Sequence, residues 1–361
     1  MANKQPFVRI TKKDNRPMWQ VLVIKGIAVL CAMAVTSVFI YSVTKLNPSK
    51  IFSSMWKGAF GSARRTWITL RDASFLLLIA LGLTPAFKMR FWNTGGEGQI
   101  LMGGLVSAAF MINFKDRLSS PVLLICMVLS SMIAGAVWGF IPAYFKAKYE
   151  ANETLFTLMM NYVATQLVEF YVDIWDTKGS HSVGIINMDS KIGWLPKLLN
   201  NDYVLIILIA LVIMVFIYIY LNYSKHGYEI AVIGESRNTA KYAGINVPAA
   251  VMRTMALSGA ICGLGGFIQT SGIAHTISKG IGAGRGFTAI IVAWLSQLNP
   301  FIMMVFSTFL VFLEKGAAQI ASDFNFNQYA SSIVTGIMLL FILGSDFFVN
   351  YNLVFRKKED K

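Results

Sequence analysis

Long apolar runs separated by short polar breaks dominate the pattern along this chain. About 20 apolar residues span the hydrocarbon core of a bilayer. The uncharged stretches 118–145, 203–224, 286–313 and 324–345 reach or exceed that length. The short alternating segments of a transmembrane β-barrel are absent from the sequence. The pattern therefore predicts an all-α, polytopic membrane protein.

The runs and breaks predict about ten transmembrane helices. They fall at approximately 21–41, 73–89, 94–113, 121–144, 154–172, 203–223, 254–274, 286–298, 300–318 and 330–350. The pieces at 73–89 and 286–298 are short for a full span. They are candidates for broken or re-entrant helices, which protein or a water-filled cavity must surround.

Basic residues set the expected orientation, because cytoplasmic loops carry an excess of Lys and Arg. Five bases precede the first apolar run, and further bases lie at 88–90, at 146–148, in the loop 224–252 and at 356–358. All of these are cytoplasmic if the N-terminus is. We therefore expect a cytoplasmic N-terminus (1–20), a transmembrane domain (21–350) and a cytoplasmic tail (351–361). The first run lacks a cleavage site, so we expect an uncleaved anchor.

Two segments are expected on the outer side. The loop 173–202 is the longest polar piece there. The segment 42–72 carries six bases against Asp72, which conflicts with an outer location. Either it is an amphipathic helix on the outer surface with its bases in water, or the count of spans is off by one in the first quarter.

Composition narrows the function classes. The net charge is +14, but the bases are scattered over flanks and loops, which argues against a nucleic-acid-binding face. The sequence contains no H-E-x-x-H, G-x-S-x-G or G-x-x-x-x-G-K-[ST] motif, so we expect no catalytic site, no cofactor, no metal and no P-loop. The three cysteines show no metal-binding spacing.

One acid stands out, in the stretch NTGGEGQILMGG, where Glu97 opens an apolar segment. A charge inside a bilayer is costly and usually has a partner or faces a polar path. Glu97 is either a helix-start acid that meets the free N–H groups of its own first turn, or a pathway or gating residue. Other polar residues either line a path or bond neighbouring helices: Asn161, Gln269, Gln297 and Asn299.

Glycines and one inner loop complete the pattern. GxxxG spacing joins Gly135 to Gly139, Gly259 to Gly263 and Gly280 to Gly284, and indicates close helix packing in lipid. The middle of the loop 224–252, ESRNTAKYAG, has the start and stop signals of a short helix. Such a helix suits docking of a soluble partner, and a solvated loop is the alternative.

Several motifs carry a resemblance to a known family. The stretch 93–99 looks like N-I-G-x-E-G-Q, Asn161-Tyr162 like L-N-Y, and 242–247 like Y-A-G-I-N-V. The chain resembles permease subunits of bacterial ABC importers for nucleosides and simple sugars, within the ribose and branched-chain amino acid permease superfamily. The similarity covers about 20–345.

The resemblance implies a type II importer fold in the bacterial inner membrane. It implies partners as well: two cytoplasmic ATPase subunits, a related or identical second permease and an extracellular binding lipoprotein. A nucleoside is the first choice of cargo, with simple sugars or riboflavin open; an ion-coupled carrier or channel is the alternative class.

The resemblance also implies roles for residues. Trp294 and Gln297 stand where the family usually has a small, glycine-containing run, and could narrow the path. The expected pathway or gating set is Asn93, Glu97, Asn161, Gln269, Trp294 and Gln297. The loop 224–252 would couple to the ATPases, with Gly227, Glu229, Gly234, Glu235, Ala240, Tyr242 and Gly244 as its main residues.

Overall fold

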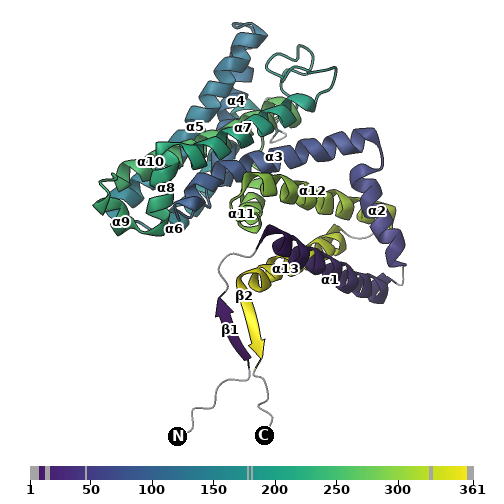
Figure 1. Cartoon of the computed structure of the whole chain (residues 1–361). Coiled ribbons are helices and arrows are strands. Elements are labelled where there is room, and N and C mark those ends of the chain that lie inside the picture. The colour runs from purple at the N-terminus through teal and green to yellow at the C-terminus, as the bar shows by residue number, and fades with distance from the viewer. Residues whose placement is uncertain are drawn as a thin grey trace, which may run out of the picture. The chain divides into compact units, whose positions relative to one another are not determined.

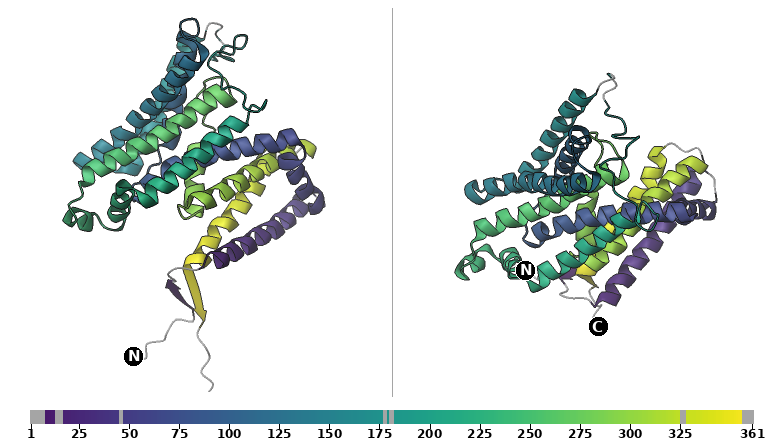
Figure 2. Two further views of the ribbon diagram at one scale, coloured as in Figure 1. Left: turned by 45° about the horizontal axis from the view of Figure 1, so that its top comes forward. Right: turned by 90° about the horizontal axis from the view of Figure 1, so that it is seen from above.

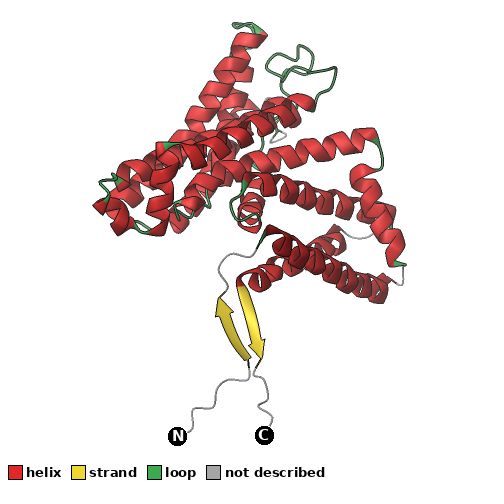
Figure 3. Ribbon diagram, viewed as in Figure 1, coloured by secondary structure: helices red, strands yellow, loops and turns green. Residues whose placement is uncertain are grey.

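The computed structural model describes residues 8–12, 17–44, 47–176, 179, 182–324 and 328–355. Helices make up most of it, with one pair of strands (Figure 3). The chain divides into two compact units, one of Met1–Thr66 with Val311–Lys361 and one of Trp67–Leu310. Each unit is described by itself.

The larger unit is a helical bundle (Figures 1 and 2). Its elements are α3 (Ala63–Lys88, from Trp67 on), α4 (Gly96–Asn113), α5 (Ser120–Tyr149), α6 (Glu153–Trp175), α7 (Val204–Tyr223), α8 (Lys225–Glu235), α9 (Arg237–Tyr242), α10 (Val247–Ile268), the π-helix η1 (Gln269–Ile273), α11 (Arg285–Leu295) and the first half of α12 (Pro300–Asp323). Along the chain, α7 runs from the loop 182–203 to α8. The loop 182–203 and the α8–α9 pair therefore lie at opposite ends of the bundle, as Figure 1 shows.

Six helices of the described residues are long and apolar enough to cross a membrane: α1, α3, α5, α7, α10 with η1, and α12. Two shorter apolar helices, α11 and the stretch Gly336–Val349, add to them. The all-α polytopic prediction is confirmed, while the number of full spans stays approximate.

Glycines bring α5 and α10 into backbone contact. A Cβ on Gly135 would collide with the carbonyl oxygen of Gly259, and one on Gly263 with that of Ser131. The packing role predicted for these glycines is thus confirmed. The same prediction is wrong for Gly280 and Gly284. They lie in the turn that precedes α11, and a Cβ on either would meet no atom within 4 Å.

The smaller unit pairs the two ends of the chain. Helix α1 (Met18–Thr44) packs along α13 (Gln328–Asn350), and α2 (Pro48–Phe60) packs on the second half of α12. Within the apolar α1, Lys25 forms an ion pair with Asp346 of α13 at 3.3 Å. An ionised pair among apolar helices gains from mutual neutralisation, because either charge alone would be costly in lipid.

A two-stranded antiparallel sheet was not predicted. Strand β1 (Val8–Lys12) pairs with β2 (Tyr351–Phe355), with Val8 opposite Phe355 and Lys12 opposite Tyr351. Part of the expected tail 351–361 is therefore strand; residues 356–361 lie outside the described residues. The pairing brings residues 8–12 and 351–355 side by side (Figure 1).

The first quarter of the chain differs from the prediction. The segment 42–72 is not one amphipathic helix, because α2 ends at Phe60 and the following residues belong to α3. Asn47 caps α2 through the N–H of Ser49, and Pro48 occupies the first turn, where its missing N–H costs nothing. The expected span 73–89 is part of the unbroken α3. Non-helical backbone enters the bundle at 89–95 and 274–284 instead.

Candidate functional site

Helix α4 begins in the interior of the bundle. The last residue of α3, Lys88, lies near the end of α7, with its Nζ 3.5 Å from the Leu221 carbonyl oxygen. Residues 89–95 then turn back inward, and Asn93 Nδ2 donates to Ser258 Oγ at 3.0 Å. Ser258 lies eleven positions after the first residue of α10, about 17 Å along its axis. The start of α4 is therefore deep, as in the discontinuous helices of transporters.

Asn93 is completely buried and organises the entry to α4. Its Oδ1 accepts from the backbone N–H of Gly95 at 3.0 Å and from Gln99 Nε2 at 3.3 Å. Every polar atom of this amide has a partner, which a buried amide requires. Asn93 therefore fixes the backbone and leaves no free group for a solute.

Asn161 of α6 holds the same turn from the other side. Its Oδ1 accepts from the N–H of Gly98 at 2.8 Å, and its Nδ2 donates to the carbonyl of Thr94 at 2.9 Å. One side chain thus satisfies an orphan N–H of α4 and a loop carbonyl together. A pathway role for Asn93 and Asn161 stays a prediction; in the structure, both side chains hold the backbone at the start of α4.

Glu97 binds the N-terminus of a second broken helix. Its Oε1 accepts from the N–H of Gly284 at 3.0 Å, and its Oε2 accepts from the N–H of Gly286 at 2.8 Å. Gly284 is the N-cap of α11, with φ 70°, a left-handed conformation that suits glycine. A Cβ on Gly286 would overlap the backbone of Glu97. The carboxylate therefore compensates the free N–H groups and the positive dipole end of α11.

Glu97 lies in the first turn of α4, as predicted, but its carboxylate accepts from the N–H groups of Gly284 and Gly286 rather than from that turn. Gly95 and Gly98, at the start of α4, donate to Asn93 and Asn161 instead. Glu97 belongs to α4 but stabilises α11, so it links two helices that both begin inside the bundle.

The far end of α11 carries an aromatic cluster. Trp294 stacks on Trp92 with ring centroids 5.2 Å apart and planes 20° apart, and both contact Phe87 at the end of α3. Trp294 is 43% exposed and Trp92 is 45% exposed. Both ends of α11 are thus fixed to residues 87–97, by carboxylate contacts at its start and by ring stacking at its end.

The remaining expected pathway residues lie apart from this centre. Gln269 is half-buried at the first position of η1, where its carbonyl accepts from the N–H of Ala274. Gln297 is exposed in the turn after α11, with φ 52°. Asn299 caps α12 through the N–H of Phe301 at 3.0 Å. The structure therefore brings together Asn93, Glu97 and Asn161, and leaves the two glutamines outside.

The loop 224–252 folds into two short helices, α8 and α9. Gly227 and Gly234 allow close contacts, since a Cβ at Gly227 would overlap the Leu221 carbonyl and one at Gly234 the Lys88 carbonyl. Glu229 of α8 forms an ion pair with Arg253 of α10 at 2.6 Å. The Arg253 hydrogen bond lowers the pKa of Glu229, so the pair persists in mildly acidic solution and is lost as the pH falls through that depressed pKa.

Helix α9 presents an exposed aromatic on a fixed support. Ala240 is fully buried, whereas Tyr242 is 93% exposed. Gly244, with φ 74°, ends the helix. Exposed Glu235 ends α8, one residue before the Ser236 cap of α9. A solvated loop would not need such a rigid backbone. An exposed tyrosine on a rigid helix is suited to contact with another protein.

The loop 150–152 between α5 and α6 lies beside α9. Arg237 of α9 contacts Glu150 at 3.5 Å, and Lys146 bonds both Glu150 (3.4 Å) and Glu153 (3.0 Å). The loop 150–152 and α9 therefore form one surface at this end of the bundle.

The sequence does not predict the roles of some residues at this site. The sequence predicts a packing role for Gly284 and no role for Gly286, yet both donate to Glu97. Trp92 was not predicted as a site residue, although Asn93 beside it was. One signal could have identified Gly284 and Gly286. It is a glycine suited to a left-handed conformation directly before an apolar helix, in a chain that also has a buried acid without a partner.

Broken helices that meet inside a bundle of long apolar helices define a polytopic membrane transport protein. A comparison with protein families gives the particular kind. The chain belongs to the branched-chain amino acid transport system / permease component family, whose model matches residues 66–343.

Curated relatives extend over most of the chain. It is 27% identical to the guanosine ABC transporter permease protein NupP of Bacillus subtilis, over 90% of this chain and 93% of the relative. It is 26% identical to a glucose ABC transporter permease protein of Haloferax volcanii (96% and 93%) and to a nucleoside ABC transporter permease protein of Lactococcus lactis (82% and 84%). No solved structure matches the chain. The chain is thus a multi-pass permease subunit.

Proposed function

We propose that this chain is the permease subunit of an ATP-driven importer and forms half of the path for a nucleoside. The observation that carries the proposal is the meeting of the α4 and α11 N-termini at Glu97, deep in the bundle. Half-helix termini near the midplane are where transporters place solute sites and moving parts. The permease names of the three relatives support the same class.

The energy source is a separate pair of ATPase subunits on the cytoplasmic side. The sequence has no P-loop of its own. The surface of α8, α9 and the loop 150–152 is rigid, exposed and joined to α3, α7 and α10, as transmission of ATPase motion requires. A second permease and an extracytoplasmic binding protein complete the assembly. Both chain termini then lie in the cytoplasm, with the 182–203 loop outside.

Nucleosides are the leading cargo because two of the three relatives are named for guanosine or nucleosides. Glucose is the second candidate, favoured by the name of the third. Riboflavin has less support, since none of these three names includes it.

The test is uptake into proteoliposomes that hold the permease pair, the ATPases and the binding protein. We expect uptake of labelled guanosine that requires internal ATP and stops with a non-hydrolysable analogue. Labelled glucose in the same vesicles decides between the two cargoes. Uptake that proceeds without ATPase subunits and follows an ion gradient would establish a carrier instead.

A further inference from the structure

Helix α2 carries a row of basic and polar residues on its exposed side. Lys50, Ser53 and Lys57 follow one another at i, i+3 and i+7, and all three are exposed. They therefore lie on one face of the helix, with the two lysines about 10 Å apart along its axis. Together with Ser49 and the end of α12, this row lines a cavity of about 400 Å³. All of these residues belong to the smaller unit.

The opposite face of α2 holds the row in place. Met55 and Ala59 are buried. A Cβ on Gly58 would collide with the Lys315 carbonyl of α12, and one on Gly316 with the side chain of Met55. Helix α2 therefore packs closely along the second half of α12 (Figure 1). Binding at the exposed face does not have to order the helix first, which lowers its entropy cost.

The exposed face of α2 has an excess of positive charge. Lys50, Lys57 and Arg64 are exposed and form no ion pair among the described residues. Arg65 Nη1 donates to the Lys57 carbonyl at 2.8 Å, at the negative end of the α2 dipole. Asp323 lines the cavity and attracts Lys57 and Arg65. The four bases outnumber this acid, so the face favours an anionic group.

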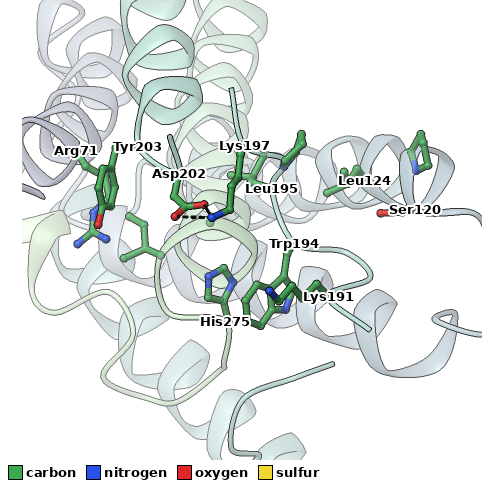
Figure 4. A pocket seen from close by; sticks show the side chains of 14 residues that line it. Arg71, Ser120, Leu124, Lys191, Trp194, Leu195, Lys197, Asp202, Tyr203 and His275 are labelled. Atoms are coloured by element: carbon green, nitrogen blue, oxygen red, sulfur yellow. Dashed lines mark hydrogen bonds and ion pairs between the residues drawn. The ribbon is translucent and has the colours of Figure 1, made fainter. Parts of the chain in front are cut away.

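A larger cavity beside the loop 191–203 also contains bases, but they are arranged differently (Figure 4). Arg71 pairs with Asp72 at 2.8 Å. Lys197 pairs with Asp202 at 3.1 Å, as the dashed lines in Figure 4 mark. These two bases are neutralised within the chain. The lysines of α2 have no ion pair of this kind in the part of the chain that the structure describes, which makes α2 the stronger candidate for binding an external anion.

Trp56 places the exposed face of α2 at the boundary of the bilayer. Its ring is 61% exposed and contacts Phe60 and Phe312, with ring centroids 5.0 Å and 6.3 Å away. Phe312 belongs to α12, which is long and apolar enough to cross a membrane. Tryptophan favours the boundary between hydrocarbon and headgroups, and Lys57 follows Trp56 directly. With both termini in the cytoplasm, as proposed above, α2 lies at the outer leaflet.

We infer that the exposed face of α2 binds the headgroups of anionic phospholipids in the outer leaflet. Lys50, Ser53 and Lys57 donate to the phosphate, while the ring of Trp56 packs beside the lipid. Such binding explains why the segment 42–72 carries six bases on the side where the charge bias predicts few. Free phosphate shares this chemistry, and the test separates it from lipid. The inference uses the proposed orientation but neither the ATPases nor the cargo.

The experiment counts the phosphatidylglycerol bound to the purified chain by native mass spectrometry, in detergent with a constant amount of phosphatidylcholine. We expect saturable binding of phosphatidylglycerol to the wild type. In Lys50→Gln/Lys57→Gln, the concentration for half saturation should rise about tenfold, because each base near an anionic surface strengthens binding severalfold. Lys57→Gln alone should give a smaller rise and remains informative if the double variant is unstable in detergent.

The matched control is Lys115→Gln/Arg117→Gln, which removes two exposed bases from the turn between α4 and α5. It should leave the half-saturation concentration unchanged. An equal rise in this control would overturn the inference, because phosphatidylglycerol would then respond to total charge. No rise in either Lys57 variant would overturn it as well.

Two further arms separate the other anions. Inorganic phosphate that displaces phosphatidylglycerol at equal concentration would assign the face to free phosphate instead of lipid. A double variant that binds phosphatidylglycerol normally, yet needs more binding protein to stimulate ATP hydrolysis in the complete transporter, would assign the lysines to protein docking. Lipid binding is measured on the permease alone. A complete assembly that fails to transport would therefore contradict the proposed function and leave the lipid site intact.

Discussion

Glu97 determines the position of α11 through two hydrogen bonds from backbone N–H groups. The partners are 187 and 189 positions away in the chain. A charged acceptor makes these bonds worth about 1.5–3 kcal/mol each. The residue is an acid because an amide offers one acceptor and one donor, whereas Gly284 and Gly286 both donate.

Replacing Glu97 by Gln should lower transport more than it lowers membrane assembly. The new NH₂ group would face a backbone N–H, so one bond is lost and α11 is released at its start. We expect uptake to fall about tenfold or more, the equivalent of one such bond, measured per amount of inserted protein. Asp116→Asn, at an exposed position in the turn after α4, is the control within the same assay. Unaffected uptake would show that α11 keeps its place without the carboxylate.

Asn161→Leu should destabilise the bundle by about 1–3 kcal/mol, because the N–H of Gly98 would stay buried without an acceptor. Thermal denaturation in detergent measures the loss. Asn238→Leu, at an exposed position on α9, is the comparison. Equal stability of the two variants would contradict the assigned role.

At this scale the sequence identifies the acid but not its partner. Glu97 is conspicuous because it stands among apolar residues and glycines. Its contacts with Gly284 and Gly286 depend on how two distant segments fold back into the bundle, which no local periodicity encodes. For the same reason, GxxxG spacing does not distinguish Gly263, which packs on α5, from Gly284, which forms a turn.

Helices α5 and α10 are joined along their backbones, so the contact tolerates no added carbon. Gly135→Ala would drive a methyl group against the carbonyl of Gly259. We expect a loss of about 1–3 kcal/mol, the usual cost of overpacking, measured by thermal denaturation.

Gly336→Ala is the matched substitution in α13, where a Cβ meets no atom within 4 Å. It should be neutral or stabilising by up to about 1 kcal/mol, from the better helix propensity of alanine. Equal losses for both variants would mean that the α5–α10 contact is looser than described.

Helix α9 should fail as a docking element when its backbone is broken. Ala240→Pro removes the N–H that donates to the Ser236 carbonyl at 3.0 Å, and proline disrupts a helix interior. The expected result is loss of co-purifying ATPase while the permease stays inserted. Tyr242→Ala tests the contact itself, because it removes an exposed ring and leaves the helix intact. Retained co-purification in both variants would place the docking surface elsewhere.

The sequence predicts α5, α7 and α10 correctly, because the length of an apolar run is enough to identify a membrane-spanning helix. The prediction failed at 42–72, because the Gly61 turn divides that segment and the basic residues after it continue directly into the apolar part of α3. It also missed the β1–β2 pair, whose strands stand 339 positions or more apart.

For the whole molecule, the strand pair requires β1 and β2 to lie on one side of the membrane. We expect cysteines introduced at Arg9, Asn352 and Tyr242 to react with an impermeant reagent from the cytoplasmic side. A cysteine at Leu199, 85% exposed in the outer loop, should react from the other side. The three native cysteines are first replaced by serine. Labelling of Arg9 and Asn352 from opposite faces would rule out the paired strands.

The ion pair between Lys25 and Asp346 has a consequence for biosynthesis. The ribosome must add 321 more residues after Lys25 before its partner exists, which takes roughly 15–65 s at ordinary elongation rates. During that interval α1 holds an uncompensated ammonium group near lipid. A product that terminates early never neutralises it. This one unneutralised lysine thus distinguishes an unfinished chain from a finished one.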